Sequence, residues 1–378
     1  MLRLPGLMDP HVHLREPGAT HKEDWSSGTA AALAGGFVCV LAMPNTQPAL
    51  TTAEVFQEVE RLATERARCD YGLYLGGSQE NVGSAPSLAA QTCGLKMYLD
   101  QTYGPLRLDD LSSVIQHFAH WPAGRPVVVH AEGRSLALPL LLSGLHHKAV
   151  HVAHVSRAEE IALIRLAKER GWPVTCEVTP HHLFLDEEDI PGITAGRAEV
   201  RPRLARASDR EALWANLEVI DCFATDHAPH TLAEKDGPNP PPGFPGLETA
   251  LPLLLGAVRE GRLTMPGLVA RMHDNPLRIW NLPAWEETFI EVDPEASWTV
   301  RGRELLSRCG WTPFEGWEVR GRVARVILRG KLAYQDGQVL APPGFGHDLF
   351  RHRAEPFSSP RAQPRKASER SRLPGPHS

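Results

Sequence analysis

Residues 4–14 read LPGLMDPHVHL, an apolar run that closes on two histidines one residue apart. Such a run is typical of a buried strand, and His11 and His13 then project from the same face because strand side chains alternate. Two imidazoles on one face can share a metal ion, although the pair by itself could also stand by chance on a half-exposed strand. The stretch therefore predicts a strand that carries the first half of a metal site.

Seven further β-rich apolar runs follow before residue 227, and amphipathic stretches such as 54–66 and 158–170 separate most of them. The runs are Phe37–Met43, Tyr71–Gly76, Gly94–Leu99, Val127–His130, Val150–His154, Pro173–Val178 and Ile220–Asp226. Strands that alternate with helices pair in parallel, and eight of them close a (β/α)8 TIM-like barrel. The runner-up is an open doubly wound sheet, but no Gly-x-Gly-x-x-Gly follows the first strand. We expect the barrel.

The chain beyond the barrel changes character twice. A Pro- and Gly-rich loop at 236–246 leads into a helical pattern, and 317–339 reads as β structure again. From about Arg351 onward Arg, Pro and Ser dominate, and such a composition has too few apolar residues to offset the entropy of ordering. We expect a barrel domain over 1–316, a small β appendage over 317–348 and a disordered basic tail or linker over 349–378.

The overall composition argues against several classes of protein. The formal net charge of -5 argues against a nucleic-acid surface over the whole molecule. No apolar run approaches the roughly 20 residues of a membrane span, and no secretory signal is visible at the N-terminus. The 6 cysteines include no Cys-x-x-Cys pair, which suits reduced thiols. We therefore expect a cytoplasmic protein that binds neither nucleic acid nor membrane.

Residues of the types that bind metals stand at the ends of four predicted strands. His130 ends the fifth strand, His154 the sixth and Asp226 the eighth, in addition to His11 and His13 on the first. In a barrel enzyme, polar residues at the C-terminal ends of strands converge on the active site. Imidazole together with carboxylate suits zinc, and five ligands are more than one zinc ion with an open position needs. The pattern predicts two zinc ions.

Two more residues near strand ends are candidates for this centre. Lys96 lies near the end of the fourth strand, where the ordinary alternative is a surface charge. Next to metal ions its pKa would fall, and a neutral amine can react with carbon dioxide to form a carbamate whose two oxygens could bridge the ions. Glu177, near the end of the seventh strand, is a candidate either as an extra ligand or as an acceptor that orients a ligating histidine.

Two longer motifs resemble the signatures of the dihydroorotase branch of the amidohydrolase superfamily. DPHVHLREPG at 9–18 is similar to the first signature, and ATDHAPH at 224–230, with Lys235 five residues further on, to the second. The similarity covers most of the chain and is closest to the dihydroorotase domains of animal multifunctional pyrimidine-synthesis proteins. MPNT at 43–46 and GLK at 94–96 match further landmarks in the same order.

The resemblance implies a reaction and a metal set. The reaction is the reversible cyclisation of N-carbamoyl-L-aspartate to L-dihydroorotate with loss of water, in pyrimidine biosynthesis, with Asp226 as acid and base. In the implied centre, His11, His13 and Asp226 hold one Zn²⁺, His130 and His154 hold the other, and a carbon dioxide-derived carbamate on Lys96 bridges them.

The substrate carries a carboxylate, for which a planar guanidinium is the natural partner. Arg15 follows His13 by two residues and is the candidate, with a surface salt bridge to Glu16 or Glu23 as the alternative. The resemblance favours substrate binding by Arg15, shared with Asn45 and His230. Further candidates are Arg201 and the backbone of Pro242 and Gly243 as substrate contacts, and Thr102 and Tyr103 as a lid.

Two alternative functions remain open from the sequence. Sister cyclic amidases such as allantoinase and dihydropyrimidinase share the metal set, but their substrates lack the same carboxylate. An inactive scaffold would keep the barrel and typically lose metal ligands, whereas all six are present here. The resemblance also implies a homo-oligomer and covalent linkage to carbamoyltransferase and carbamoyl phosphate synthetase domains, which the short N-terminal segment and the basic tail fit.

Overall fold

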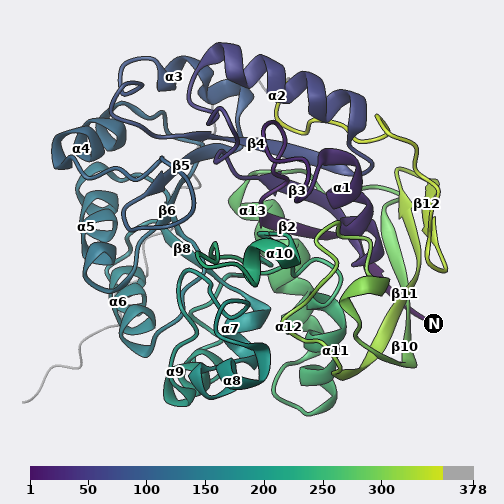
Figure 1. Cartoon of the computed structure of the whole chain (residues 1–378). Coiled ribbons are helices and arrows are strands. Elements are labelled where there is room, and N and C mark those ends of the chain that lie inside the picture. Colours follow the sequence, from purple (N-terminus) through teal and green to yellow (C-terminus); the bar gives the residue numbers. More distant parts are fainter. Residues whose placement is uncertain (352–378) are drawn as a thin grey trace, which may run out of the picture.

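The barrel strands follow one another around a single parallel sheet (Figure 1) in a computed structural model that describes residues 1–351. They are β2 (Leu7–Val12), β3 (Phe37–Ala42), β4 (Asp70–Gly76), β5 (Gly94–Tyr98), β6 (Val127–His130), β7 (Val150–Val152), β8 (Val174–Val178) and β9 (Cys222–Phe223). A parallel bridge between Val12 and His227 joins the first strand to the segment after the last one, so the barrel is nearly closed. The predicted barrel is confirmed, and an open doubly wound sheet is excluded.

Helices connect successive strands along the outside of the barrel, as parallel pairing requires (Figure 1). Several of them begin at side-chain caps: for example, the Asp24 carboxylate accepts from the Ser27 amide at 2.7 Å, and the Thr52 hydroxyl accepts from the Val55 amide at 3.4 Å. The helices are α1 (Trp25–Ala34), α2 (Ala53–Arg66), α3 (Ala85–Leu88), α4 (Leu111–His120), α5 (Ala137–His146), α6 (Ala158–Glu169), α7 (Pro180–Phe184), α8 (Ile190–Ile193), α9 (Ala207–Ala215), α10 (Leu232–Lys235), α11 (Ala250–Arg259), α12 (Met265–Val269) and α13 (Asn275–Ile279). Within the described part of the chain, no helix combines the length and the apolarity of a membrane span.

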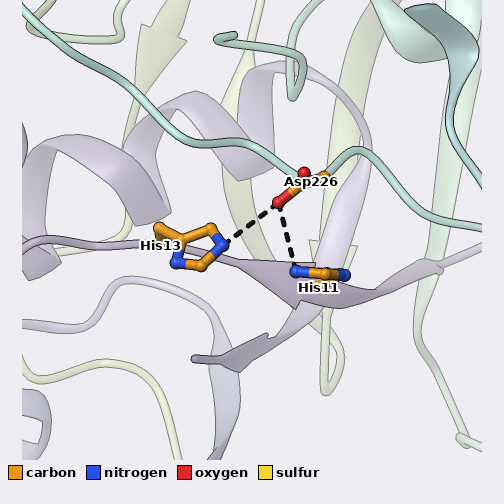
Figure 2. Close-up of side chains that lie close together, drawn as sticks. All are labelled: His11, His13 and Asp226. Carbon is orange, nitrogen blue, oxygen red and sulfur yellow. Dashed lines mark hydrogen bonds and ion pairs between the residues drawn. The ribbon is translucent and has the colours of Figure 1, made fainter. Parts of the chain in front are cut away.

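The C-terminal ends of the barrel strands bring distant residues together. His11 lies on β2, His13 directly follows it, and Asp226 follows β9. Figure 2 shows both imidazoles directed at the Asp226 carboxylate, although more than 200 residues separate them along the chain. The parallel topology therefore assembles this group without any local sequence contact.

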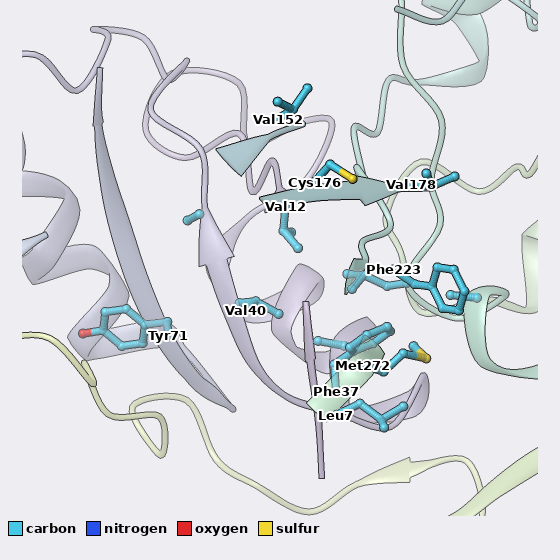
Figure 3. Close-up of a cluster of buried hydrophobic side chains, with 14 of the residues drawn as sticks. Leu7, Val12, Phe37, Val40, Tyr71, Val152, Cys176, Val178, Phe223 and Met272 are labelled. Carbon is cyan, nitrogen blue, oxygen red and sulfur yellow. The ribbon is translucent and has the colours of Figure 1, made fainter. Parts of the chain in front are cut away.

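Alternating side chains of the strands fill two apolar layers. On β3, Val38 and Val40 belong to the large cluster between strands and helices, part of which Figure 3 shows with Val12, Val152 and Phe223. The residues that follow each of them on β3, Cys39 and Leu41, belong to a second cluster together with Trp280. The period of two on a strand that is buried on both faces explains why the barrel strands read as nearly continuous apolar runs.

The second sheet is antiparallel, with the order β1-β10-β11-β12-β13. It contains β1 (Leu2–Pro5), β10 (Phe289–Thr299), β11 (Glu318–Leu328), β12 (Lys331–Gln335) and β13 (Gln338–Val339). The sequence predicted an appendage from 317–348 alone and one strand over 4–14. Instead β1 and β10 belong to the antiparallel sheet of the appendage. The first strand ends at Pro5, and the chain crosses at Gly6 into the barrel sheet, where β2 begins. A Cβ at Gly6 would lie 2.6 Å from Val38 Cγ2, so this crossing is tightly packed.

The first residues of the expected tail belong to the folded structure. The Leu349 amide donates to the Tyr71 carbonyl at 3.0 Å, and the buried Phe350 ring fills the space beside Gly72 on β4. The rest of the predicted tail, from residue 352 onward, lies outside the described residues.

Candidate active site

Three buried side chains form the first metal-type group. His11 Nε2 and His13 Nε2 each lie 3.1 Å from Asp226 Oδ1 (Figure 2). The other ring nitrogens face acceptors, since His11 Nδ1 lies 2.5 Å from Glu177 Oε1 and His13 Nδ1 lies 2.6 Å from Asn45 Oδ1. In a neutral ring the proton is then on Nδ1, and Nε2 keeps its lone pair. Two lone pairs and a carboxylate oxygen converge without a proton between them, which is the donor set of a metal site.

His130 and His154 form a second pair beside the first. His130 Nδ1 lies 2.8 Å from His154 Nε2, and the His154 ring lies 5.3 Å from the His11 ring between centroids. His154 Nδ1 is buried and has no hydrogen-bond partner among the described residues. Burial lowers the pKa of both His130 and His154, so the neutral, metal-binding forms of the rings are favoured.

Lys96 lies fully buried on β5, close enough to His130 and His154 for its charge to act on both rings. Its Nζ has no hydrogen-bond partner within residues 1–351. A buried amine without a hydrogen-bond partner destabilises the folded state by about 1–3 kcal/mol or more, so Lys96 is unfavourable here as an unmodified side chain. Burial also lowers the pKa of Lys96 to about 8, which brings the neutral amine within reach near neutral pH. The position thus has the chemistry that carbamate formation needs.

Glu177 uses both carboxylate oxygens on protein groups. Oε1 accepts from His11 Nδ1 and from the His154 amide at 3.3 Å, and Oε2 lies 3.0 Å from His151 Nε2. Burial by itself would raise the pKa of Glu177, but His11 and His151 hold it well below its ordinary value. Of the two predicted roles, the geometry favours an ionised acceptor that orients His11 over an extra metal ligand.

Left-handed backbone conformations mark three residues at this edge of the barrel. Arg15, His154 and Asp226 have φ angles of 61°, 35° and 45°. Residues other than glycine adopt such angles at a cost of order 1–3 kcal/mol each, and they persist where the surroundings require the side chain to point in a given direction. All three were candidate site residues from the sequence.

Asp9 contributes to the site, although the sequence analysis did not select it. Its buried carboxylate accepts from the His11 amide at 3.1 Å and from the Thr225 hydroxyl at 2.5 Å and amide at 3.2 Å. It therefore joins the end of β2 to the segment that carries Asp226. The available signal was its place two residues before His11 on the predicted strand.

Arg15 lines the pocket and is only 3% exposed. Its Nε donates to the Pro229 carbonyl at 3.1 Å. One terminal nitrogen is buried without a partner among the described residues, and the other lies 3.0 Å from His230 Nε2. The alternative of a surface salt bridge is wrong, because the guanidinium is buried and neither Glu16 nor Glu23 contacts it.

The contacts of His230 decide its tautomer. Lys22 Nζ, which can only donate, lies 3.0 Å from His230 Nδ1, and the Pro242 carbonyl, which can only accept, lies 3.0 Å from Nε2. The neutral ring therefore carries its proton on Nε2. The single N–H of His230 is then taken by the Pro242 carbonyl. Since Arg15 cannot donate to a protonated nitrogen, both terminal nitrogens of its guanidinium are left without an acceptor among the described residues. Burial first, and then Arg15 and Lys22, lower the pKa of His230 and keep the ring neutral.

Tyr103 covers this group of donors. Its ring lies 5.0 Å from the Arg15 guanidinium carbon and packs edge-on against His230 with centroids 4.9 Å apart. Its hydroxyl accepts from Lys22 Nζ at 3.2 Å, and its carbonyl accepts from Asn45 Nδ2 at 3.3 Å. Lys22 was not found from the sequence, because a lone lysine in a loop is ordinarily a surface charge.

A pocket opens above these groups. It is lined by His11, His13, Arg15, Asn45, Tyr98, Thr102, Tyr103, His130, His154, Arg201, Asp226, Ala228, Pro242 and Gly243. Three candidates lie outside this lining: Lys96 and Glu177 are fully buried, and His230 contacts Arg15. Tyr98 is an addition that the sequence analysis missed.

Comparisons with known proteins agree with this geometry. A family model described as "Dihydro-orotase-like" matches residues 1–84. "Multifunctional protein CAD" of Squalus acanthias is 54% identical over 364 residues, which are 96% of this chain and 16% of that protein. "Dihydroorotase" of Pyrococcus furiosus is 34% identical over 355 residues, covering 90% of this chain and 83% of that protein.

Solved structures share the fold over most of their length. L-hydantoinase (dihydropyrimidinase) from Arthrobacter aurescens superposes with a TM-score of 0.88 at 25% identity, covering 93% of this chain and 89% of that one. The inactive dihydroorotase-like domain of the Chaetomium thermophilum CAD-like multifunctional protein gives 0.79 at 29% identity, covering 92% and 99%.

The chain spans only 16% of the length of the multifunctional relative, but most of the length of the archaeal one. A family assignment therefore rests on a relative that this chain matches almost from end to end. The chain belongs to the dihydroorotase family.

Proposed function

We propose that this chain catalyses the reversible cyclisation of N-carbamoyl-L-aspartate to L-dihydroorotate with loss of water. The observation that carries the proposal is the buried Arg15 guanidinium, which lines the pocket together with the metal-type histidines and whose terminal nitrogens have no acceptor among the described residues. Two parallel guanidinium donors fit a carboxylate, and a carboxylate beside the amide that reacts distinguishes dihydroorotate from other cyclic amides.

The metal centre in this proposal contains two zinc ions. His11, His13 and Asp226 would hold one, His130 and His154 the other, and Lys96 as a carbamate would join both. The converging lone pairs and the unpaired buried amine support this assignment. When bound, the ions would make a water nucleophilic near neutral pH and polarise the amide carbonyl.

The chain's own groups would orient the substrate. Arg15 and His230 would bind its carboxylate. Pro242 has no N–H, and the Gly243 amide already donates to the Glu199 carbonyl at 3.0 Å. This part of the backbone can therefore only accept, and the Pro242 carbonyl is placed to accept from a substrate N–H. Arg201, Asn45 and Thr102 line the same pocket, and Tyr103 over Arg15 would exclude water as a lid.

Asp226 would move the proton. In hydrolysis it takes a proton from the attacking water and delivers it to the ring nitrogen as the C–N bond breaks, and in synthesis the same transfers run backward. Burial alone would raise the pKa of Asp226, but His11 and His13 hold it well below its ordinary value. The carboxylate is therefore ionised and ready to accept at the start of hydrolysis.

The setting of the protein is part of the proposal. We infer that it works in the cytoplasm as a homo-oligomer, linked to carbamoyltransferase and synthetase domains in one polypeptide. The name "Multifunctional protein CAD" of the Squalus acanthias relative supports linkage to further domains, and the free state of all six cysteines supports a reducing compartment. A full-length transcript that encodes no further domain would contradict the linkage.

The test of the activity is turnover of dihydroorotate, allantoin and dihydrouracil side by side, together with a zinc count. We expect a strong preference for dihydroorotate and about two zinc ions per chain. Preference for either other substrate would indicate a sister amidase. Fewer than about two ions after gentle purification, with no turnover of any of the three, would indicate a scaffold.

A further inference from the structure

Lys235 is a buried lysine that the proposed mechanism leaves without a role. It is the last residue of α10 and stands at the end of the second sequence motif. Its side chain is 0% exposed, yet it does not line the pocket and meets no carboxylate. Within residues 1–351, Nζ instead donates to three backbone carbonyls, those of Glu199 at 2.6 Å, Pro241 at 2.9 Å and Gly243 at 3.3 Å.

The ammonium group matches this surrounding in number and in charge. It has three protons, and three carbonyl oxygens take them. The rings of Phe244 and Trp311 lie 5.7 and 5.4 Å from Nζ, and their faces add an attraction for the cation. Trp311 in turn donates from Nε1 to the His230 carbonyl at 2.7 Å. Among the side chains, only lysine supplies three donors from one point.

The carbonyls that Lys235 binds belong to two segments that contribute residues to the pocket lining. Glu199 precedes the pocket residue Arg201 by two positions. The carbonyls of Pro241 and Gly243 flank that of Pro242, which turns the other way, toward His230. Successive carbonyls of an extended backbone alternate in direction, so fixing two of them on Lys235 fixes the one between them on the pocket side.

The opposite side of this loop is already fixed by close packing. Gly243 has a φ of 147°, and a Cβ there would lie 2.4 Å from the Ala228 carbonyl oxygen. The Phe244 carbonyl accepts from the Ala228 amide at 2.7 Å. The loop is therefore packed against Ala228 on one side, while Lys235 holds its Pro241 and Gly243 carbonyls and the Gly243 amide binds the Glu199 carbonyl.

We propose that Lys235 is a positioning residue that sets the Pro242 carbonyl and the Arg201 segment at the substrate-binding distance. The proposal rests on the proposed function, because it concerns the same pocket. It assigns Lys235 no contact with substrate or metal. Its loss should therefore weaken substrate binding and leave the chemical step and the metal content in place.

The test compares Lys235→Met with a matched variant, Lys168→Met. Lys168 also donates to a backbone carbonyl, that of Val219 at 2.6 Å, and it lies outside the pocket. For Lys235→Met we expect KM for dihydroorotate to rise about tenfold, as for loss of hydrogen bonds from a charged donor, with kcat within about threefold. Zinc content should equal that of the parent. Lys168→Met should lower the thermal midpoint without changing KM.

Several outcomes separate positioning from a structural role. An unchanged KM in Lys235→Met, or a loss of kcat that follows a loss of zinc, would overturn the proposal. If Lys235→Met does not fold, Lys235→Ala is assayed with and without ethylammonium, against sodium at equal ionic strength. Recovery of KM by the amine alone would support the proposal, and no recovery would contradict it. A parent chain that turns over no dihydroorotate would instead refute the proposed function.

Discussion

The two sides of the pocket are built in different ways. On the metal side, His11, His130 and His154 lie on or next to parallel strands, and the hydrogen bonds of the barrel fix their backbones. On the substrate side, His230 and Pro242 lie in loops, and single side chains such as Lys22 hold them in place. Groups that must converge on one point thus lie on the rigid sheet. Groups that would recognise the rest of the substrate in the proposed function lie on segments that can be adjusted separately.

The largest effect is expected from removal of Asp226, which is both a proposed metal ligand and the proposed acid and base. Asp226→Ala should lower turnover in both directions by about 10³-fold or more, since it removes the acid and base. The fold and most of the metal should remain, because four histidines stay in place. Rates, zinc content and circular dichroism measure this, with Asp236→Asn on the surface as control. Unfolding of Asp226→Ala would mean that the residue is structural.

Lys96→Met tests the metal side alone. Activity should fall by on the order of 10²-fold or more, because the bridge between the metal positions is lost. The metal-free protein should become no less stable, since an unpaired buried amine is replaced by an apolar chain of similar length. Zinc content, turnover and the melting temperature of the chelator-treated protein measure the two effects. A large drop in the melting temperature of the metal-free variant would contradict the unpaired state of Lys96.

Arg15→Met tests the substrate side. Hydrogen bonds to charged groups contribute about 1.5–3 kcal/mol, so KM for dihydroorotate should rise about 10- to 100-fold. Slow hydrolysis of dihydrouracil, which has no carboxylate, should stay the same in parent and variant. If both substrates lose activity equally, Arg15 supports the fold of the site and does not select the carboxylate.

The smallest effect is expected at Lys22, which acts through His230 and Tyr103. Lys22→Met removes the donor that keeps the His230 proton on Nε2, and KM should rise about 3- to 10-fold at unchanged kcat. Lys331→Met, at an exposed position on β12, serves as control. A rise in KM that Tyr103→Phe reproduces would assign the effect to the contact with the Tyr103 hydroxyl.

The same division explains what the sequence could predict. Strand-end residues such as His130 and Asp226 follow from periodicity and topology, because the position along a strand determines the position in the barrel. The contacts of Lys22 and Lys235 do not follow, since they depend on loop paths that no periodic pattern encodes. The prediction of one strand over 4–14 is wrong for a similar reason. Its first part, β1, pairs with β10 nearly 290 residues away, and no local sequence pattern indicates that pairing.

The left-handed backbone at Arg15, His154 and Asp226 has a consequence for engineering. Glycine adopts these φ angles without strain, whereas the residues present at the three positions adopt them at an energetic cost. A selection for heat resistance alone would therefore favour glycine at positions that the reaction needs. Under the proposed function, directed evolution of this chain should screen turnover and melting temperature together, because the easiest gains in stability at these three sites would come from inactive molecules.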